Sequence, residues 1–232
     1  MGNLIDLSKK AKIQLEKKQL LDVKAEIVFV IDTSYSMGNL YNNGTVQELV
    51  DRLLGIGMNM DTNKSIDVFS FSDRAKEVGR ANEKNHMDYV ESNRIVVNGG
   101  TNYAPVMKLI LDKYASSNKG FFSGLFSSKN KKQEIPTFVF FITDGDNSDK
   151  SDATELVKES SNQPIFWQFV GIGNTNFSFL EKLDTMSGRF LDNANFFQVN
   201  DIASISDDEL YSRLLNEFPT WLQQAKAKGI LE

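Results

Sequence analysis

The chain has 232 residues, of which 41% are hydrophobic and 25% charged. This length and composition suffice for a single α/β domain with a full hydrophobic core and an added helix. The formal net charge of −5 disfavours a general nucleic-acid-binding role. With no cysteine and one histidine, His86, the sequence excludes disulfides, cysteine nucleophiles, thiolate zinc sites and multi-histidine metal sites. The sequence can still form a site that binds a hard cation through oxygen atoms.

The N-terminal stretch carries no targeting signal that we recognise. It lacks the uninterrupted apolar run of a signal peptide, and Asp6 stands where a myristoylation pattern requires serine or threonine. No run approaches the roughly 18 apolar residues of a membrane-spanning helix. The absence of cysteine fits a reducing compartment. We therefore expect a soluble, cytoplasmic protein.

Near the N-terminus, apolar residues recur at helical spacing. We expect an amphipathic helix over residues 4–18, in an N-terminal segment 1–22 that packs on a main domain of residues 23–232. The apolar stripe of this helix consists of Leu4, Leu7, Ala11 and Leu15.

The main domain alternates apolar runs with helical patterns. The apolar runs are typical of strands buried on both faces of a sheet. This alternation predicts an α/β fold: a doubly wound, mostly parallel central sheet with helices on both faces. In such sheets, ligands bind at the carboxyl ends of the strands. The expected strands are 26–32, 65–71, 136–143, 164–172 and 195–199, and the expected helices are 46–60, 103–115, 152–161, 177–186 and 206–226.

Oxygen-bearing side chains lie at three boundaries of these elements. Three of them are spaced by two residues, starting at the last residue of the strand 26–32, so the loop that leaves the strand can turn all of them toward one point. An aspartate follows the strand 136–143, and a threonine in a glycine-rich turn precedes the helix 103–115. Carboxylates and hydroxyls are the ligands that a hard divalent cation prefers. The sequence therefore predicts one cation site, formed by Asp32, Ser34, Ser36, Thr101 and Asp144.

The order Asp-x-Ser-x-Ser, Thr and Thr-Asp-Gly resembles the metal-ion-dependent adhesion site of von Willebrand factor A domains, which have a Rossmann-like fold. The resemblance implies that Ser34, Ser36 and Thr101 coordinate the cation directly or nearly so. It also implies that Asp32 and Asp144 bind directly or through water, and that one position is left for an Asp or Glu of a protein partner. We expect one divalent cation, with Mg²⁺ preferred over Ca²⁺ or Mn²⁺.

A narrower resemblance covers about residues 20–225. Four phrases are similar to A-type domains of bacterial tellurium-resistance and stress-response proteins: 101–105 (TNYAP), 142–147 (ITDGDN), 164–173 (PIFWQFVGIG) and 217–222 (EFPTWL). This resemblance implies a cytoplasmic bacterial protein associated with metal or chemical stress. It implies no particular activity, because a fold and a motif describe a binding site and not a reaction. Within the motif, Thr33 and Tyr35 differ from the small residues often found there.

Three hypotheses of function follow. The first is a non-enzymatic, cation-dependent protein-binding module with no nucleic-acid partner, in which a partner carboxylate completes the site. The second is a cation-dependent phosphohydrolase, although the sequence lacks the second aspartate of the phosphoaspartate motif and a Walker-type loop. The third is a metal or stress sensor without enzymatic activity, for which the lack of cysteine disfavours soft-metal sequestration.

Several features have simpler interpretations. The motif after strand 26–32 could cap the following helix. Residues 144–155 match an EF-hand loop superficially, but Asp149 stands where that loop needs glycine. We expect Asp149 and Asp152 to solvate the loop and begin the next helix, with Asp146 as a candidate supporting group of the cation site. His86 is interpreted as a surface or packing residue.

The segment 117–134 is unusual because it mixes aromatic residues with glycine, serine and lysine. We expect burial or disorder in preference to a contact with a protein partner. A peripheral membrane contact through residues 119–132 is the least favoured interpretation. The apolar residues of this segment are Phe121, Phe122, Leu125 and Phe126.

Overall fold

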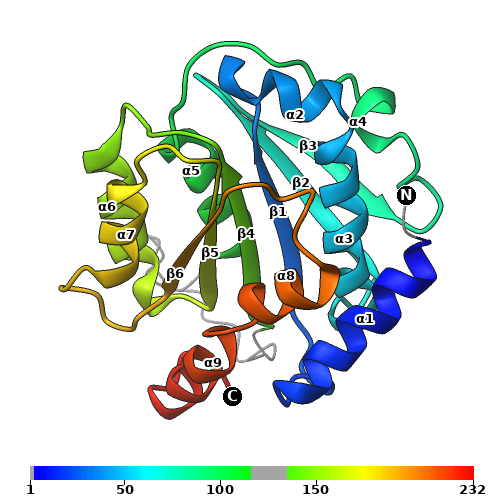
Figure 1. The fold of residues 1–232 in the computed structure, drawn as a ribbon. Coiled ribbons are helices and arrows are strands. Elements are labelled where there is room, and N and C mark those ends of the chain that lie inside the picture. The colour runs from blue at the N-terminus through cyan, green and yellow to red at the C-terminus, as the bar shows by residue number, and fades with distance from the viewer. Residues whose placement is uncertain (1–2, 116–134) are drawn as a thin grey trace, which may run out of the picture.

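The computed structural model describes residues 3–115 and 135–232. Within these residues, the centre of the molecule is a six-stranded sheet with the order β3-β2-β1-β4-β5-β6 (Figure 1). All neighbouring strands are parallel except β3, which runs antiparallel to β2 at one edge. The predicted doubly wound, mostly parallel α/β fold is confirmed. The strands are β1 (Glu26–Asp32), β2 (Ser65–Phe71), β3 (Ala75–Asn82), β4 (Thr137–Thr143), β5 (Ile165–Ile172) and β6 (Ala194–Val199).

Helices cover both faces of this sheet, and alternate residues of each central strand supply the two cores. In β1, Ile27, Phe29 and Ile31 face one core, whereas Val28 and Val30 face the other. Because both faces are buried, these strands have continuous apolar runs. The first helical layer contains α1 (Leu4–Lys17), α3 (Thr45–Met60), α8 (Asp207–Leu214) and α9 (Phe218–Ala227), and the second contains α5 (Ala104–Tyr114), α6 (Lys150–Glu159) and α7 (Ser178–Thr185). Shorter helical turns are η1 (Tyr35–Met37), α2 (Gly38–Asn42), α4 (Tyr89–Ser92) and η3 (Ser160–Asn162).

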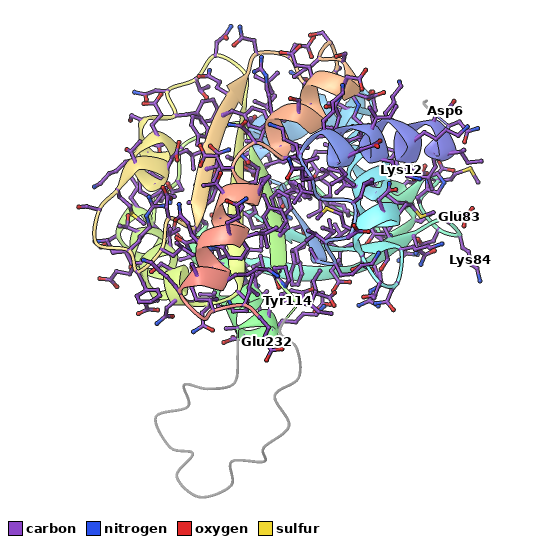
Figure 2. All side chains as sticks on the ribbon, turned by 90° about the horizontal axis from the view of Figure 1, so that it is seen from below. Asp6, Lys12, Glu83, Lys84, Tyr114 and Glu232 are labelled. Atoms are coloured by element: carbon purple, nitrogen blue, oxygen red, sulfur yellow. The ribbon has the colours of Figure 1, made fainter. Side chains whose placement is uncertain are left out.

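The N-terminal helix α1 lies against α3, with its apolar stripe buried and Asp6 and Lys12 on the outside (Figure 2). The two helices approach closely at Gly55 of α3. A Cβ atom at that position would lie 3.1 Å from the backbone carbon of Leu7 and 2.9 Å from the hydroxyl oxygen of Tyr211. A glycine is needed here because it allows one backbone to approach another.

The edge strand β3 was missed by the sequence analysis. Its sequence is largely polar and most of its side chains are exposed or half-buried. An edge strand of this kind is held by backbone pairing to one neighbour, so it needs no apolar periodicity. Charged side chains along β3 also discourage pairing with another chain.

The prediction of one continuous helix over residues 206–226 was wrong. The structure has two helices, α8 and α9, separated by residues 215–217. Pro219 lies in the first turn of α9. Proline has no backbone N–H and its ring clashes with the preceding turn, so it is tolerated at the start of a helix but not inside one.

The phenylalanine- and lysine-rich segment 117–134, with its expected burial or contacts, lies outside the described residues. Among the helices of residues 3–115 and 135–232, none is both long enough and apolar enough to cross a membrane.

Candidate cation site

The predicted site lies where the strand order of the sheet reverses. From β1 the chain continues to β2 on one side, and β4 later pairs with β1 on the other side. The loops that leave β1 and β4 therefore diverge at their carboxyl ends and leave space between them, as is usual for ligand sites in open α/β sheets. The pairing of Ile31 with Ile142 brings the next residues, Asp32 and Thr143, together.

Asp32 is buried at the bottom of this site. Its Oδ1 accepts a hydrogen bond from the backbone N–H of Ser34 at 2.7 Å, and its Oδ2 accepts one from the Thr143 hydroxyl at 2.6 Å. Removal from water nevertheless raises the pKa of Asp32 from 3.8 to about 6, because desolvation outweighs these hydrogen bonds. Burial also raises the pKa of Asp144.

A chain of hydroxyl groups connects the two aspartates. Ser34 Oγ lies 3.1 Å from Ser36 Oγ, and the Ser36 hydroxyl donates to Asp144 Oδ1 at 2.7 Å. Ser34 is buried, Asp144 is half-buried and Ser36 is exposed, so the group extends from the sheet to the solvent. Four of the five predicted residues are thus joined in one hydrogen-bonded cluster.

The fifth predicted residue, Thr101, lies on a loop that contacts both the loop after β1 and the loop after β4. The N–H of Tyr35 donates to the Gly99 carbonyl at 3.3 Å, and the N–H of Ser148 donates to the Thr101 carbonyl at 3.0 Å. Within the described residues, the Thr101 hydroxyl has no hydrogen-bond partner. The structure therefore brings the Thr101 backbone to the site but does not join its side chain to the cluster.

The chemistry of these donors fits a hard divalent cation. The cluster offers two carboxylates and hydroxyl groups, with no nitrogen or sulfur ligand. Among the described residues, neither Asp32 nor Asp144 forms an ion pair with a basic side chain. No group of three or more His, Cys, Asp or Glu side chains that could hold a metal is found in the same residues. A site here would consequently depend on its hydroxyl groups as well as its acids.

Comparison with known families identifies the domain. The model of the family described as "vWA found in TerF C terminus" matches residues 24–231. The chain belongs to this family. This vWA domain is also 42% identical, over 233 residues, to the uncharacterized protein YcbR of Bacillus subtilis (strain 168), covering 98% of the chain and 90% of that protein.

Solved structures support the same fold for the vWA domain at much lower identity. Proximal thread matrix protein 1 of the mussel byssus matches with a TM-score of 0.60 and 16% identity, covering 84% of the chain and 48% of the mussel protein. The chain thus spans about half the length of that protein. The SpRpn10 VWA domain matches with a TM-score of 0.53 and 12% identity, covering 84% of the chain and 95% of that domain. Another structure of the mussel protein, with a TM-score of 0.53, 22% identity and coverage of 84% and 48%, has a zinc-occupied adhesion motif.

Sequence reasoning missed two side chains that position the loops of this vWA domain. The two Asp149 carboxylate oxygens accept hydrogen bonds from the backbone N–H groups of Tyr103 and Ala104, at 2.9 and 2.7 Å. These bonds satisfy free donors at the start of α5 and place a negative charge at its positive end. The Tyr103 hydroxyl donates to the Gly145 carbonyl at 2.7 Å. Together they hold the Thr101 loop against the Asp144 loop.

This geometry contradicts the EF-hand interpretation of residues 144–155. The carboxylate of Asp149 bonds to the start of α5, and α6 begins at the next residue, Lys150. Asp149 does precede α6 as expected, but its side chain does not simply solvate the loop. Asp146 pairs with Lys150 at the surface and makes no side-chain contact with the cluster in the described residues.

His86 is not part of the candidate site. Its Nδ1 lies 2.7 Å from Asp51 Oδ1, and both side chains are largely buried. The pair lies in a groove between α3, the start of α1 and residues 83–88. This position agrees with the interpretation of His86 as a packing residue.

Proposed function

We propose that this chain is a divalent-cation-dependent protein-binding module. The observation that carries the proposal is the cluster of Asp32, Ser34, Ser36 and Asp144, which contains two carboxylates and no basic partner among the described residues. A buried carboxylate without a counter-charge is unfavourable unless something neutralises it. When bound, a divalent cation supplies that positive charge and a coordination position for a partner's carboxylate.

The chain's own residues would hold and orient the cation. The Ser34 N–H and the Thr143 hydroxyl fix the two oxygens of Asp32, so this carboxylate is already ordered. The Thr101 hydroxyl is available as a further ligand. We propose Mg²⁺ as the cation, since an all-oxygen site favours a hard ion over zinc. The mussel protein, which has a similar fold, holds zinc at its adhesion motif, and this supports occupancy of the motif by a metal.

An exposed aromatic residue marks the rim where a partner would dock. Tyr35 lies between two proposed ligands, Ser34 and Ser36, and is 74% exposed. Tyrosine is enriched in protein interfaces because it buries a large rigid surface and keeps a polar end. We propose that Tyr35 packs on the protein whose Asp or Glu completes the site.

We propose that the chain acts by binding and not by catalysis. The acids at the site are those assigned to the cation, and His86 is paired with Asp51 in a different groove. Membership of the TerF-like family supports a role in a bacterial tellurium-resistance or chemical-stress system. The similarity to a protein of Bacillus subtilis supports the bacterial setting.

Calorimetric titration of Mg²⁺, Ca²⁺ and Mn²⁺ into the metal-free protein tests the proposal. We expect saturable binding near one equivalent in the parent chain and no binding in the variants Asp32→Ala and Asp144→Ala. Asp146→Asn is the matched control, because it removes an exposed acid of the same loop and should bind like the parent. Equal binding by the parent and both Ala variants would refute the assigned site.

A further inference from the structure

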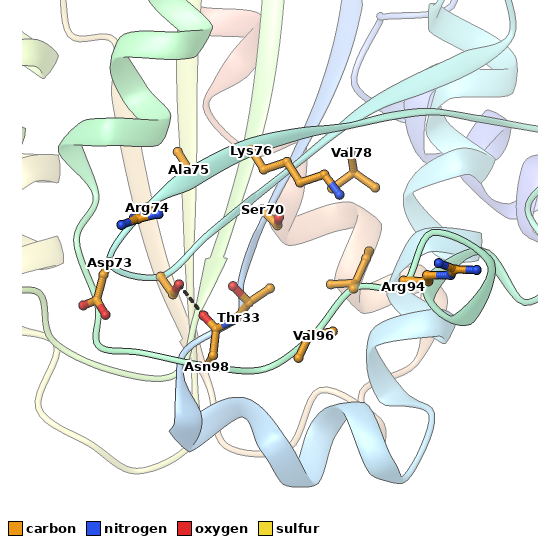
Figure 3. Close-up of a pocket in the computed structure, with 12 residues that line it drawn as sticks. Thr33, Ser70, Asp73, Arg74, Ala75, Lys76, Val78, Arg94, Val96 and Asn98 are labelled. Atoms are coloured by element: carbon orange, nitrogen blue, oxygen red, sulfur yellow. Dashed lines mark hydrogen bonds between the residues drawn. The ribbon is translucent and has the colours of Figure 1, made fainter.

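A groove, shown in Figure 3, is lined in part by Thr33, the residue between Asp32 and Ser34 of the candidate cation site. Its volume is about 430 Å³, within the usual range for binding clefts. Its walls come from the end of β2, from β3 and from the segment 94–98. Two wall residues are joined by a hydrogen bond, from the Asn98 N–H to the Thr33 carbonyl at 2.7 Å. Because Thr33 separates Asp32 from Ser34, the groove and the site share a wall.

The groove carries basic side chains that no acid neutralises. Arg74, Lys76 and Arg94 are exposed, and none of them forms an ion pair within residues 3–115 and 135–232. Arg74 and Arg94 are seen at opposite ends of the groove, with Lys76 between them (Figure 3). The lining also includes one acid, Asp73, whose Oδ1 accepts a hydrogen bond from the Gly100 N–H at 3.0 Å. This local excess of positive charge contrasts with the net charge of −5 for the chain.

The groove also presents apolar surface. Val96 is 63% exposed, and the half-buried Val78 and Ile95 lie beside it in the lining. Together these three side chains give the groove an apolar surface that is suitable for contact with another chain. The basic groove is the surface formed by Arg74, Lys76, Arg94, Val96, Thr33 and Asn98.

We propose that the basic groove binds an acidic segment of the same protein partner whose carboxylate reaches the cation site. The partner's motif is then an Asp or Glu with further acidic residues close to it in sequence. This inference rests on the proposed function, since the partner's carboxylate at the cation positions the rest of the acidic segment. Once a divalent cation neutralises the two carboxylates of the site, these acids no longer balance the positive charge of the three unpaired basic side chains nearby, and an acidic segment supplies the missing negative charge. Arginine binds carboxylates through paired N–H donors, which adds orientation to attraction.

The charge arrangement also favours a protein segment that is acidic along its length. A single small anion would be satisfied at the cation alone and would leave Arg74 and Arg94 unused. An extended segment advances about 3.3 Å per residue, so several of its side chains can reach different points of one groove. The basic groove would additionally attract such a segment from solution and speed its association.

The test is a selection from a display library of random peptides that flank one fixed Asp, carried out in Mg²⁺ and, separately, in excess chelator. The parent is compared with the variant Arg74→Gln/Lys76→Gln/Arg94→Gln. A control variant, Lys12→Gln/Lys17→Gln/Lys84→Gln, removes the same charge from exposed positions on α1 and after β3. Figure 2 shows Lys12 and Lys84 at the surface of the molecule. Calorimetry of Mg²⁺ alone should give one equivalent in all three proteins, which verifies that each is folded.

We expect Mg²⁺-dependent peptides enriched in Asp and Glu next to the fixed Asp for the parent and the control, and no such enrichment for the groove variant. A selected acidic peptide should bind the groove variant about tenfold more weakly, with a smaller difference at high salt. Mg²⁺-dependent peptides without acidic enrichment, or equal enrichment with the groove variant, would overturn the groove proposal and leave the proposed function intact. If no peptide depends on Mg²⁺, both proposals fail.

Discussion

Replacing Asp32 by Asn is expected to stabilise the metal-free protein. Asp32 is fully buried, at 0% exposure, and desolvation raises the pKa of its carboxyl from 3.8 to about 6. This difference corresponds to about 3 kcal/mol by which the ionised carboxylate lowers the free energy of unfolding. Asparagine keeps the shape of the side chain and an oxygen for the Ser34 N–H, while the Thr143 hydroxyl can accept a hydrogen bond from its amide. We therefore expect a gain of about 1–3 kcal/mol near neutral pH.

The pH dependence of this gain follows from the sign of the shift. Because the pKa of Asp32 is higher in the folded state than in the unfolded chain, the folded protein binds this proton more tightly. The destabilisation is absent below about pH 4, increases as the pH rises toward 6, and is complete above that. The difference between Asp32→Asn and the parent should follow the same course. Urea unfolding of both proteins in chelator, at several pH values across this interval, measures it.

Mg²⁺ should reverse the order of stability. At a concentration about 1,000 times its dissociation constant, a cation that binds only the folded parent adds about 4.1 kcal/mol, which exceeds the gain of the Asp32→Asn variant, and it should add nothing to that variant. The control Asp146→Asn should change the free energy of unfolding by less than about 0.5 kcal/mol, because Asp146 is exposed. The reasoning would be refuted if metal-free Asp32→Asn were less stable than the parent at neutral pH.

Three further variants test other parts of the structure. Thr101→Val should leave the urea midpoint of the metal-free protein unchanged, because its hydroxyl has no partner in the described residues, and should weaken Mg²⁺ binding in calorimetry. Asp149→Asn should lower the free energy of unfolding by about 1–2 kcal/mol, through loss of a charged cap at the start of α5, and should also weaken Mg²⁺ binding. Gly55→Ala should lower the free energy of unfolding by about 1–3 kcal/mol, because the new methyl group meets the Leu7 backbone and the Tyr211 hydroxyl.

Matched controls separate these effects from general damage. Thr101→Ser keeps the hydroxyl and should retain Mg²⁺ binding; equal loss in the Ser and Val variants would argue against that hydroxyl as a ligand. Asp152→Asn removes an exposed charge of α6 and should be nearly neutral, so equal destabilisation by it would contradict the capping role of Asp149. Gly38→Ala adds a methyl group where no atom lies within 4 Å, and it should be tolerated.

The sequence was most informative where burial is uniform. The strands β1, β4 and β5 are buried along almost their whole length, so each appears as a largely apolar run with a sharp end. An acid at the end of such a run lies where the carboxyl ends of the strands meet the loops. This is how Asp32 and Asp144 could be predicted to lie close together. The family motif added Thr101. The assignment of all five residues as cation ligands remains a prediction.

Other features depend on contacts between distant segments, and here only the tertiary structure was decisive. β3 has little apolar pattern because its backbone pairing with β2 defines it. Asp149 precedes one helix but caps another, α5, which begins 45 residues earlier in the chain. The basic groove combines Arg74 with Arg94, which lie on different segments. Local sequence determines burial and turn propensity, whereas hydrogen bonds and charge clusters between remote segments form only after the sheet has brought them together.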